Sequence, residues 1–323
     1  MTEQVLKLQQ EMARTSLGVE IEMNGITRHR AAKVAAEFFG TGRWEDTNYR
    51  NGYRAFSAWD QQGREWMFKY DSSIEGPDSQ KVELVTPILY LADVETLQEL
   101  CRRLRKAGGR SDYTRHCGVH VHCGIDGQTP QSLRTLANLM ASHEDLLAAA
   151  LKLDPYRVER YCRPMDQRFL KEVNKKKPKT MAQLADIWYS SQGYDFHRES
   201  KYNRSRYKQL NYHAVFTHNT IEYRLFQFDP PADGKQNGIH AGALKAFIQL
   251  SLALTVKAKE MKTASSKPCQ MDNPKFTMRT WLNSLGLIGR EFETARRVFT
   301  RNLAGDCAFR FGREAYEASR RAA

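Results

Sequence analysis

Two histidines, His120 and His122, stand one residue apart in the stretch 118–124 (GVHVHCG). Successive side chains of a β-strand point to opposite faces, so both imidazoles share one face of the strand that this pattern predicts. The alternating valines then point the other way, into apolar packing. Paired imidazoles are typical of metal and phosphate sites. The strand is therefore a candidate for either kind of site.

A second stretch, 17–23 (LGVEIEM), alternates strictly between apolar and other residues and predicts another strand. Glu20 and Glu22 share its polar face, about 7 Å apart given the rise of a strand. Two carboxylates in a partly buried site repel each other unless water, a basic group or a cation separates them. An ordinary solvent-facing strand explains this stretch alone equally well.

Two more strand-like stretches add ionisable groups of the same kind: 81–86 (KVELVT) with Glu83, and 220–226 (TIEYRLF) with Glu222 and Arg224. For Glu83 a structural salt bridge is the alternative to a ligand role. If all four strands belong to one antiparallel sheet, one face packs on helices and the other carries carboxylates and imidazoles.

Four carboxylates on one face are unfavourable without cations. Oxygen-rich sites with one or two imidazoles suit Mg²⁺ or Mn²⁺. Such metals clamp nucleotide phosphates during phosphoryl transfer. Arg224 would add a fixed positive charge for a phosphate or a carboxylate.

Zinc is the competing metal, through Cys117 and Cys123 on either side of the histidines. Strand parity argues against it, because both cysteines fall on the face opposite to His120 and His122. A P-loop, a GxGxxG fingerprint and a GxSxG elbow are all missing from the sequence, so the corresponding enzyme classes lack support.

Composition limits the class of protein. The 323 residues are 41% hydrophobic, carry a net charge of +13 and contain six scattered cysteines without a CxxC pair. We expect a cytoplasmic protein with reduced thiols, no signal peptide and no apolar run of the ~20 residues that a membrane helix needs. The positive charge suggests anionic partners, although no standard nucleic-acid-binding motif is present.

Helix start and stop signals predict helices over 28–39, 94–107, 130–152 and 155–161, and later over 239–262, 277–286, 290–303 and 307–319. We expect residues 1–16 to be a polar, weakly helical and loose lead-in, and the lysine-rich stretch 171–180 to be a mobile loop. Residues 212–216 read as a strand that forms a hairpin with 220–226.

The sequence resembles the amidoligase family of bacteria, phages and fungi, within the glutamine synthetase-like carboxylate–amine ligases. The resemblance covers residues 17 to about 229. It is carried, in the family's order, by the following five motifs: 18–22 (GVEIE), 69–73 (KYDSS), 82–87 (VELVTP), 118–122 (GVHVH) and 220–224 (TIEYR).

The resemblance implies an α+β fold, in which an antiparallel sheet forms a half-barrel with helices on its convex face, as in the glutamine synthetase catalytic domain. It implies a catalytic domain over 17–262 and a helical C-terminal extension over 263–323, or one domain overall. The implied site has three parts: metal ligands Glu20, Glu22, Glu83, His120 and Glu222; nucleotide-binding residues His122, Arg224, Lys69, Tyr207 and Asn211; and catalytic residues Glu222, Arg224 and Glu83.

The implied activity is ATP-dependent ligation, with Mg²⁺ or Mn²⁺ as cofactor. A substrate carboxylate is phosphorylated, and an amine then displaces phosphate to give an amide. The implied partners are small-molecule or peptide acids and amines. The alternative is a protein that binds or modifies nucleic acid or another anionic macromolecule, using the net charge and the lysines of 171–179. The sequence does not identify the acid, the amine, the general base or the oligomeric state.

Overall fold

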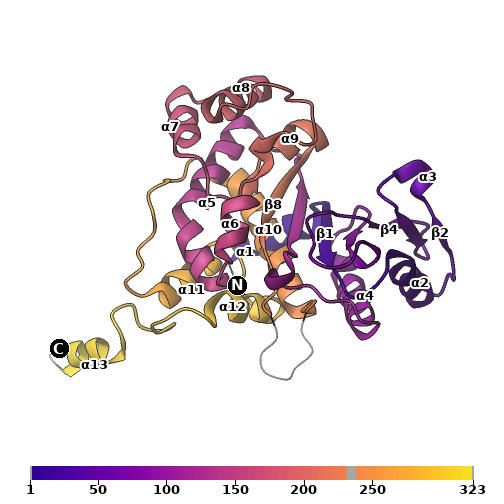
Figure 1. The fold of residues 1–323 in the computed structure, drawn as a ribbon. Helices are drawn as coiled ribbons and strands as arrows, with labels where there is room; N and C mark the ends of the chain where they lie inside the picture. The colour runs from indigo at the N-terminus through magenta and orange to yellow at the C-terminus, as the bar shows by residue number, and fades with distance from the viewer. Residues whose placement is uncertain (1, 231–237, 322–323) are drawn as a thin grey trace.

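The computed structural model describes residues 2–230 and 238–321, and its centre is one eight-stranded antiparallel sheet (Figure 1). The strand order is β2-β3-β4-β5-β1-β6-β8-β7. The four strands expected to carry the site, β5, β1, β6 and β8, are neighbours at the middle of this sheet. The bounds are β1 Leu17–Met23, β2 Trp44–Asp46, β3 Phe56–Trp59, β4 Glu65–Lys69, β5 Val82–Val85, β6 Val119–Gly124, β7 Leu210–Asn211 and β8 Thr220–Phe226.

Helices cover the apolar face of the sheet. They confirm the predicted α+β class. Their bounds are α1 Glu3–Arg14, α2 Arg28–Phe39, α3 Asn48–Asn51, α4 Val94–Lys106, α5 Pro130–Leu151, α6 Pro155–Arg160, α7 Gln167–Lys176, α8 Met181–Gln192, α9 His213–His218, α10 Ala241–Glu260, α11 Pro274–Ser284, α12 Glu293–Thr300 and α13 Arg313–Arg321. The last of these, α13, projects from the body of the protein and has no buried residue (Figure 1).

The core forms between the sheet and α10, which contacts β6 and β8. Val19, Val121 and Tyr223 point to this side and are fully buried. The hydroxyl of Tyr223 lies 2.8 Å from that of Thr255 on α10, so its polar tip is paired inside the core. Because the apolar residues occupy one parity, the other parity, with its charged residues, faces away from this helix layer.

Capping residues set several helix ends where the sequence predicted them. The Thr27 hydroxyl accepts a hydrogen bond from the Arg30 amide at 3.1 Å, and Gly40 ends α2 in the left-handed conformation. Thr129 caps α5 in the same way, with Pro130 at its first position. These helix caps depend only on residues close in the sequence, so the helix ends lie where the sequence predicts them.

The helical tendency expected within 1–16 is confirmed, but the described residues 2–16 are not a loose lead-in, and that part of the prediction was wrong. Thr2 caps α1, which places Leu8 and Met12 on one side, four residues apart, and both are buried. The helix packs on α10. Two apolar positions in a polar segment are a weak signal on their own, and only the partner helix stabilises them.

The basic stretch and the expected hairpin also differ from prediction. Residues 171–176 belong to α7, which is capped by Asp166 and buries Phe169, Leu170 and Val173. Residues 213–218 form α9 instead of a strand. The side chain of Asn211 accepts a hydrogen bond from the His213 amide at 2.8 Å, and this bond turns the chain from strand into helix.

Helix α10 corrects the expectation that no apolar segment is long enough to cross a membrane. Its 20 residues are long and apolar enough by length and composition, although 83% of its most apolar window is buried inside the protein. A buried core helix meets the same criterion, and the packing of α10 on the sheet accounts for its composition.

Glu144 in α5 gives a test of the folded core through pH. Its side chain is buried and accepts a hydrogen bond from the Met165 amide at 2.7 Å. Burial raises the pKa of Glu144 from 4.5 to about 7. The folded state therefore favours the protonated acid, so this contribution to stability is fully present below pH 4.5 and is lost as the pH rises through 7.

We expect Glu144→Gln to stabilise the protein above pH 7 by up to roughly 3 kcal/mol and to flatten the loss of stability between pH 4.5 and 7. Glutamine keeps the acceptor oxygen without the charge. Denaturant unfolding at pH 5 and pH 8 measures both effects. Glu95→Gln, at an exposed position of α4, should keep the parent's pH dependence. An unchanged slope in Glu144→Gln would contradict the assignment.

Candidate active site

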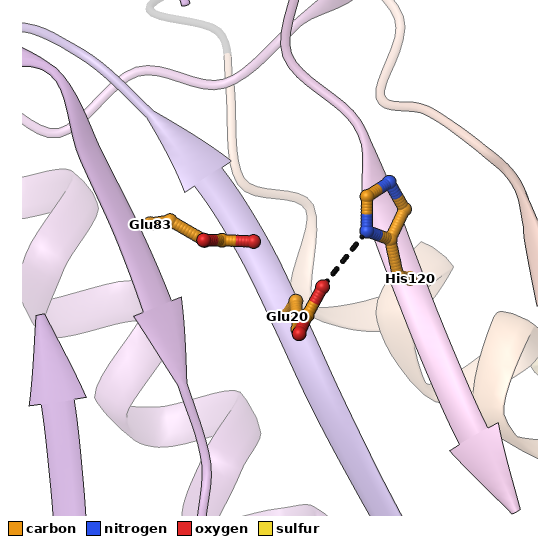
Figure 2. A group of neighbouring side chains, drawn as sticks. All are labelled: Glu20, Glu83 and His120. Atoms are coloured by element: carbon orange, nitrogen blue, oxygen red, sulfur yellow. Dashed lines mark hydrogen bonds and ion pairs between the residues drawn. The ribbon is translucent and has the colours of Figure 1, made fainter. Parts of the chain in front are cut away.

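Strand register brings the charged residues into rows across the polar face of the sheet. β1 pairs with β5 on one side and β6 on the other. Glu22 lies opposite Glu83, which lies opposite Lys69 on β4. Glu20 lies opposite His120. Figure 2 shows Glu20, Glu83 and His120 projecting from three adjacent strands toward one another.

A further row continues to the other edge of the sheet. His122 on β6 lies opposite Glu222 on β8, and Glu222 lies opposite Asn211 on β7. Directly opposed residues of an antiparallel pair share a face and have Cβ atoms about 5 Å apart. The two predicted histidines and four predicted carboxylates therefore line one surface.

The carboxylates of the site differ in how many hydrogen bonds and ion pairs they form. Glu20 Oε2 lies 2.9 Å from His120 Nδ1 (Figure 2), and Lys69 Nζ lies 2.9 Å from Glu83 Oε2. Glu222 is held more tightly, because it pairs with Arg224 and accepts a hydrogen bond from the Asn211 amide group at 2.6 Å. All of these carboxylates except Glu20 are buried.

The pKa shifts follow this uneven pairing. Burial would raise the pKa of Glu222, but the charge of Arg224 lowers it to about 2. Partial burial likewise opposes ionisation of Glu20, but the hydrogen bond with His120 and the nearby imidazole of His122 lower the pKa of Glu20. Burial and the charge of Glu20 instead raise the pKa of Glu83 well above its usual value. The Glu83 side of the site therefore lacks positive charge, even with Lys69 present.

The same residues form three overlapping groups that could hold metal ions. In each group, the ligand atoms lie within 4.8 Å of one another. Further support comes from His122, whose Nε2 is buried without a hydrogen-bond partner and lies 3.8 Å from oxygens of Glu20 and Glu222. Carboxylates with an imidazole suit Mg²⁺ or Mn²⁺. The groups are Glu20, Glu83 and His120; Glu20, His122 and Glu222; and Glu22, Asp71 and Glu83.

One cavity of about 420 Å³ contains all ten residues predicted from the sequence. This volume lies within the usual range of small-molecule sites. The cavity lining places the residues together, and their individual roles stay predictions. The ten are Glu20, Glu22, Lys69, Glu83, His120, His122, Tyr207, Asn211, Glu222 and Arg224.

Sequence reasoning assigned no role to several other residues of the cavity. Asp71 stands in the KYDSS motif and shares a potential metal group with Glu22 and Glu83. The available signal was its position two residues after Lys69, where β4 ends. Tyr53, Lys201 and Tyr202 meet at the cavity mouth from segments about 150 residues apart, and the sequence contains no signal for that encounter.

Arg157 is a deeply buried charged residue among those that were missed. It comes from α6, is 1% exposed, and places its Nη1 3.8 Å from Glu22 Oε2. Gly118 makes room for it, because a Cβ at this position would overlap the guanidinium group. The Gly118 amide also donates a hydrogen bond to Glu22. The glycine that opens the histidine strand thus allows a cation to lie against Glu22.

The cysteines and the lysine-rich segment lie apart from the cavity. Cys123 belongs to the hydrophobic core, and burial raises its pKa to about 12. No cysteine belongs to the three potential metal groups found among the described residues. Lys171, Lys175 and Lys179 are exposed and do not line the cavity. The lysines on which the nucleic-acid alternative depends therefore lie on a surface that is separate from the cavity.

Comparisons with known proteins point to one family. The family described as "putative amidoligase enzyme" matches residues 13–255, which include all five motifs. No curated protein matches the sequence. Among solved structures, a bifunctional glutathione synthetase from Pasteurella multocida aligns with a TM-score of 0.44 and 11% identity, over 94% of this chain and 49% of that one. The chain thus spans about half of that protein's length, and a TM-score this low supports no conclusion.

A metal ion should compensate the charge at Glu83. We expect Glu83→Gln to raise the stability of the metal-free protein at pH 8 by about 1 kcal/mol, because burial and the charge of Glu20 disfavour the ionised form of Glu83 more than its ion pair with Lys69 favours it. The same change should weaken Mn²⁺ binding at least about tenfold, the loss typical even of an outer-sphere partner. Thermal unfolding against Mn²⁺ concentration measures both. Glu75→Gln, an exposed acid outside the cavity, is the control. Equal Mn²⁺ midpoints in Glu83→Gln and the parent would contradict the metal assignment.

The fit between Gly118 and Arg157 should appear as energetic coupling. We expect Gly118→Ala to destabilise the protein by about 1–3 kcal/mol through overpacking. In an Arg157→Ala background the same change should have a much smaller effect, because the guanidinium group is gone. Gly18→Ala on the same face is the matched control, since its Cβ would meet His122 Cβ at an ordinary 3.8 Å. Denaturant unfolding of the parent, Gly118→Ala, Arg157→Ala and the double variant gives the coupling energy. Additive effects of the two changes would contradict the contact.

Proposed function

The chain belongs to the family of putative amidoligase enzymes, and we propose that it is an ATP-dependent carboxylate–amine ligase that acts through an acyl phosphate. The observation that carries this proposal is the single cavity in which overlapping groups of potential metal ligands lie between two fixed cations, Lys69 and Arg224. Phosphoryl transfer depends mainly on neutralising and positioning charge, and this arrangement is suited to both tasks.

In the proposed reaction, an oxygen of the substrate carboxylate attacks the γ-phosphorus of ATP, and the bond to the bridging oxygen breaks. The products of this step are an acyl phosphate and ADP. An amine nitrogen then attacks the acyl carbon, loses a proton, and displaces inorganic phosphate to leave an amide. The net reaction consumes ATP, an acid and an amine, and gives an amide, ADP and phosphate.

The metal supplies charge neutralisation on the phosphates, and we assign its ligation to five residues of the sheet face. Glu83 and Glu222 are also assigned to the reacting centre, since each lies between the acidic groups and a cation. The ligands are Glu20, Glu22, Glu83, His120 and Glu222.

The nucleotide is assigned to the Arg224 side of the cavity. Arg224 would face the transferred phosphate, because its guanidinium is held in place by Glu222 and lies 5.9 Å from the ring of Tyr207. His122, whose pKa is raised by the charge of Glu222 against the effect of burial, adds a second donor. Asn211 and Tyr207 border the same end, and Lys69 faces the phosphates from the opposite end.

The finer fold assignment is part of the same proposal. We assign the sheet to the half-barrel type of the glutamine synthetase catalytic domain, with its charged face on the concave side. The catalytic part is assigned to residues 17–262 and the C-terminal extension to 263–323. The family match ends at residue 255, inside α10.

Hydroxylamine tests the proposal without knowledge of the amine, because it converts an acyl phosphate into a hydroxamate. We expect ATP- and Mg²⁺-dependent hydroxamate when amino acids and short peptides are supplied as acids. With the acid found, ¹⁸O from its carboxylate should appear in the released phosphate. Glu20→Ala and Glu222→Ala should lower the rate at least about 10²-fold with folding intact.

Lys171→Ala, on the exposed part of α7, is the control and should keep the parent's rate. Full activity in both glutamate variants would contradict the site assignment. ADP release that needs no acid would contradict the ligase itself and indicate an ATPase.

A further inference from the structure

A second cavity, of about 490 Å³, adjoins the candidate active site at its Arg224 end. The two cavities share Tyr161 and Tyr207, whose rings meet edge to face with centroids 6.3 Å apart. The Nε of Arg224 lies 3.5 Å from the carbonyl oxygen of Tyr161. The second cavity is lined by Glu159, Arg160, Tyr161, Arg163, Arg204 and Tyr207.

Three arginines from two segments converge on this cavity. Backbone hydrogen bonds join the segments: the Arg163 amide donates to the Tyr207 carbonyl at 3.2 Å, and the Gln209 amide donates to the Arg163 carbonyl at 2.8 Å. Arg160 ends α6 and stacks on Tyr156 at 4.8 Å from the ring centre. Arg204 begins the turn that leads to Tyr207. The fold therefore fixes the backbones that carry the three guanidinium groups.

These positive charges are not compensated within the described part of the chain. None of Arg160, Arg163 and Arg204 forms an ion pair with a described residue, and Glu159 is the only acid in the lining. The Nε of Arg163 is buried without a hydrogen-bond partner. Guanidinium groups gathered in a concave site without counter-charges are suited to binding carboxylates or phosphates.

We propose that this second cavity binds an acidic extension of the carboxylate substrate, so that the substrate is an acidic peptide. The inference rests on the proposed ligase function. Tyr161 and Tyr207 line both cavities, so a ligand that places its reacting carboxylate among the metal-binding groups and also contacts the arginines extends past these two rings and is longer than one amino acid. Three arginines accept several carboxylates, and Glu159 accepts a hydrogen bond from a peptide N–H.

Fluorescence anisotropy of labelled tetraglutamate without nucleotide tests the cavity separately from catalysis. Binding of tetraglutamate and no binding of tetraglutamine is expected. Arg160→Gln/Arg163→Gln/Arg204→Gln should weaken tetraglutamate binding by at least about tenfold. Arg160→Gln/Arg204→Gln, at two exposed positions, should weaken binding in the same direction and guards against misfolding of the triple variant.

The matched control removes the same charge elsewhere. Lys171→Gln/Lys175→Gln/Lys179→Gln acts at exposed positions outside both cavities and should change binding by no more than about twofold. The thermal shift of the parent with ATP and Mg²⁺ should persist in the arginine variants. Equal weakening by the arginine and lysine triples would overturn the inference, because net charge alone would then explain binding.

Other outcomes separate the inference from the proposed function. Loss of the ATP–Mg²⁺ shift in the arginine variants would assign the second cavity to the nucleotide and overturn the inference. Stronger, arginine-dependent binding of a single-stranded DNA of equal charge would overturn it in favour of nucleic acid. Ligase activity on neutral acids without tetraglutamate binding would overturn the inference alone. Tetraglutamate binding without hydroxamate formation would overturn the ligase and the substrate role of the peptide, and would leave the second cavity as a binding site for acidic peptides.

Discussion

The register of β1 between β5 and β6 is the constraint on which the site depends. It aligns Glu22 with Glu83 and Glu20 with His120 on one face. A slip of one residue would turn every one of these side chains into the core and expose the valines. The opposite face prevents this slip, because Val19 and Val121 are buried against the helix layer around α10. The apolar core thus fixes a like-charge pair that strand pairing alone disfavours.

Much of the arrangement was predictable because it follows from alternation. The parity of 17–23 and 118–124 placed the carboxylates and imidazoles on one face, and the structure brings them together. The same parity separated Cys123 from the histidines, and Cys123 lies in the core. Caps such as Thr27 and Thr129 were predictable for a related reason, since each depends on residues at most three positions away.

Contacts between distant segments were not predictable. Arg157 reaches Glu22 only because the folded chain brings its guanidinium group against Gly118, just before β6, and its sequence neighbourhood predicts only the start of a helix. The second cavity arises where Arg163 pairs through its backbone with the segment before β7. The prediction failed at short elements for another reason. Helix α9 has six residues, and the hydrogen bond that the Asn211 side chain accepts from the His213 amide outweighs the strand propensity of its sequence.

The distribution of charge along the face suggests a direction for the ligands. Around Glu222, Arg224 and the histidines hold the carboxylate ionised, and the uncompensated arginines of the second cavity lie just beyond. Around Glu83, the further carboxylates of Glu20, Glu22 and Asp71 give four acidic groups against two cations, Lys69 and Arg157. Electrostatics therefore favours cations at the Glu83 end and anionic groups at the Arg224 end. In the proposed ligase reaction, an acid and a nucleotide entering from the Arg224 end would meet the candidate metal-binding carboxylates with their own carboxylate and phosphates first. Phosphoryl transfer to a carboxylate requires this orientation.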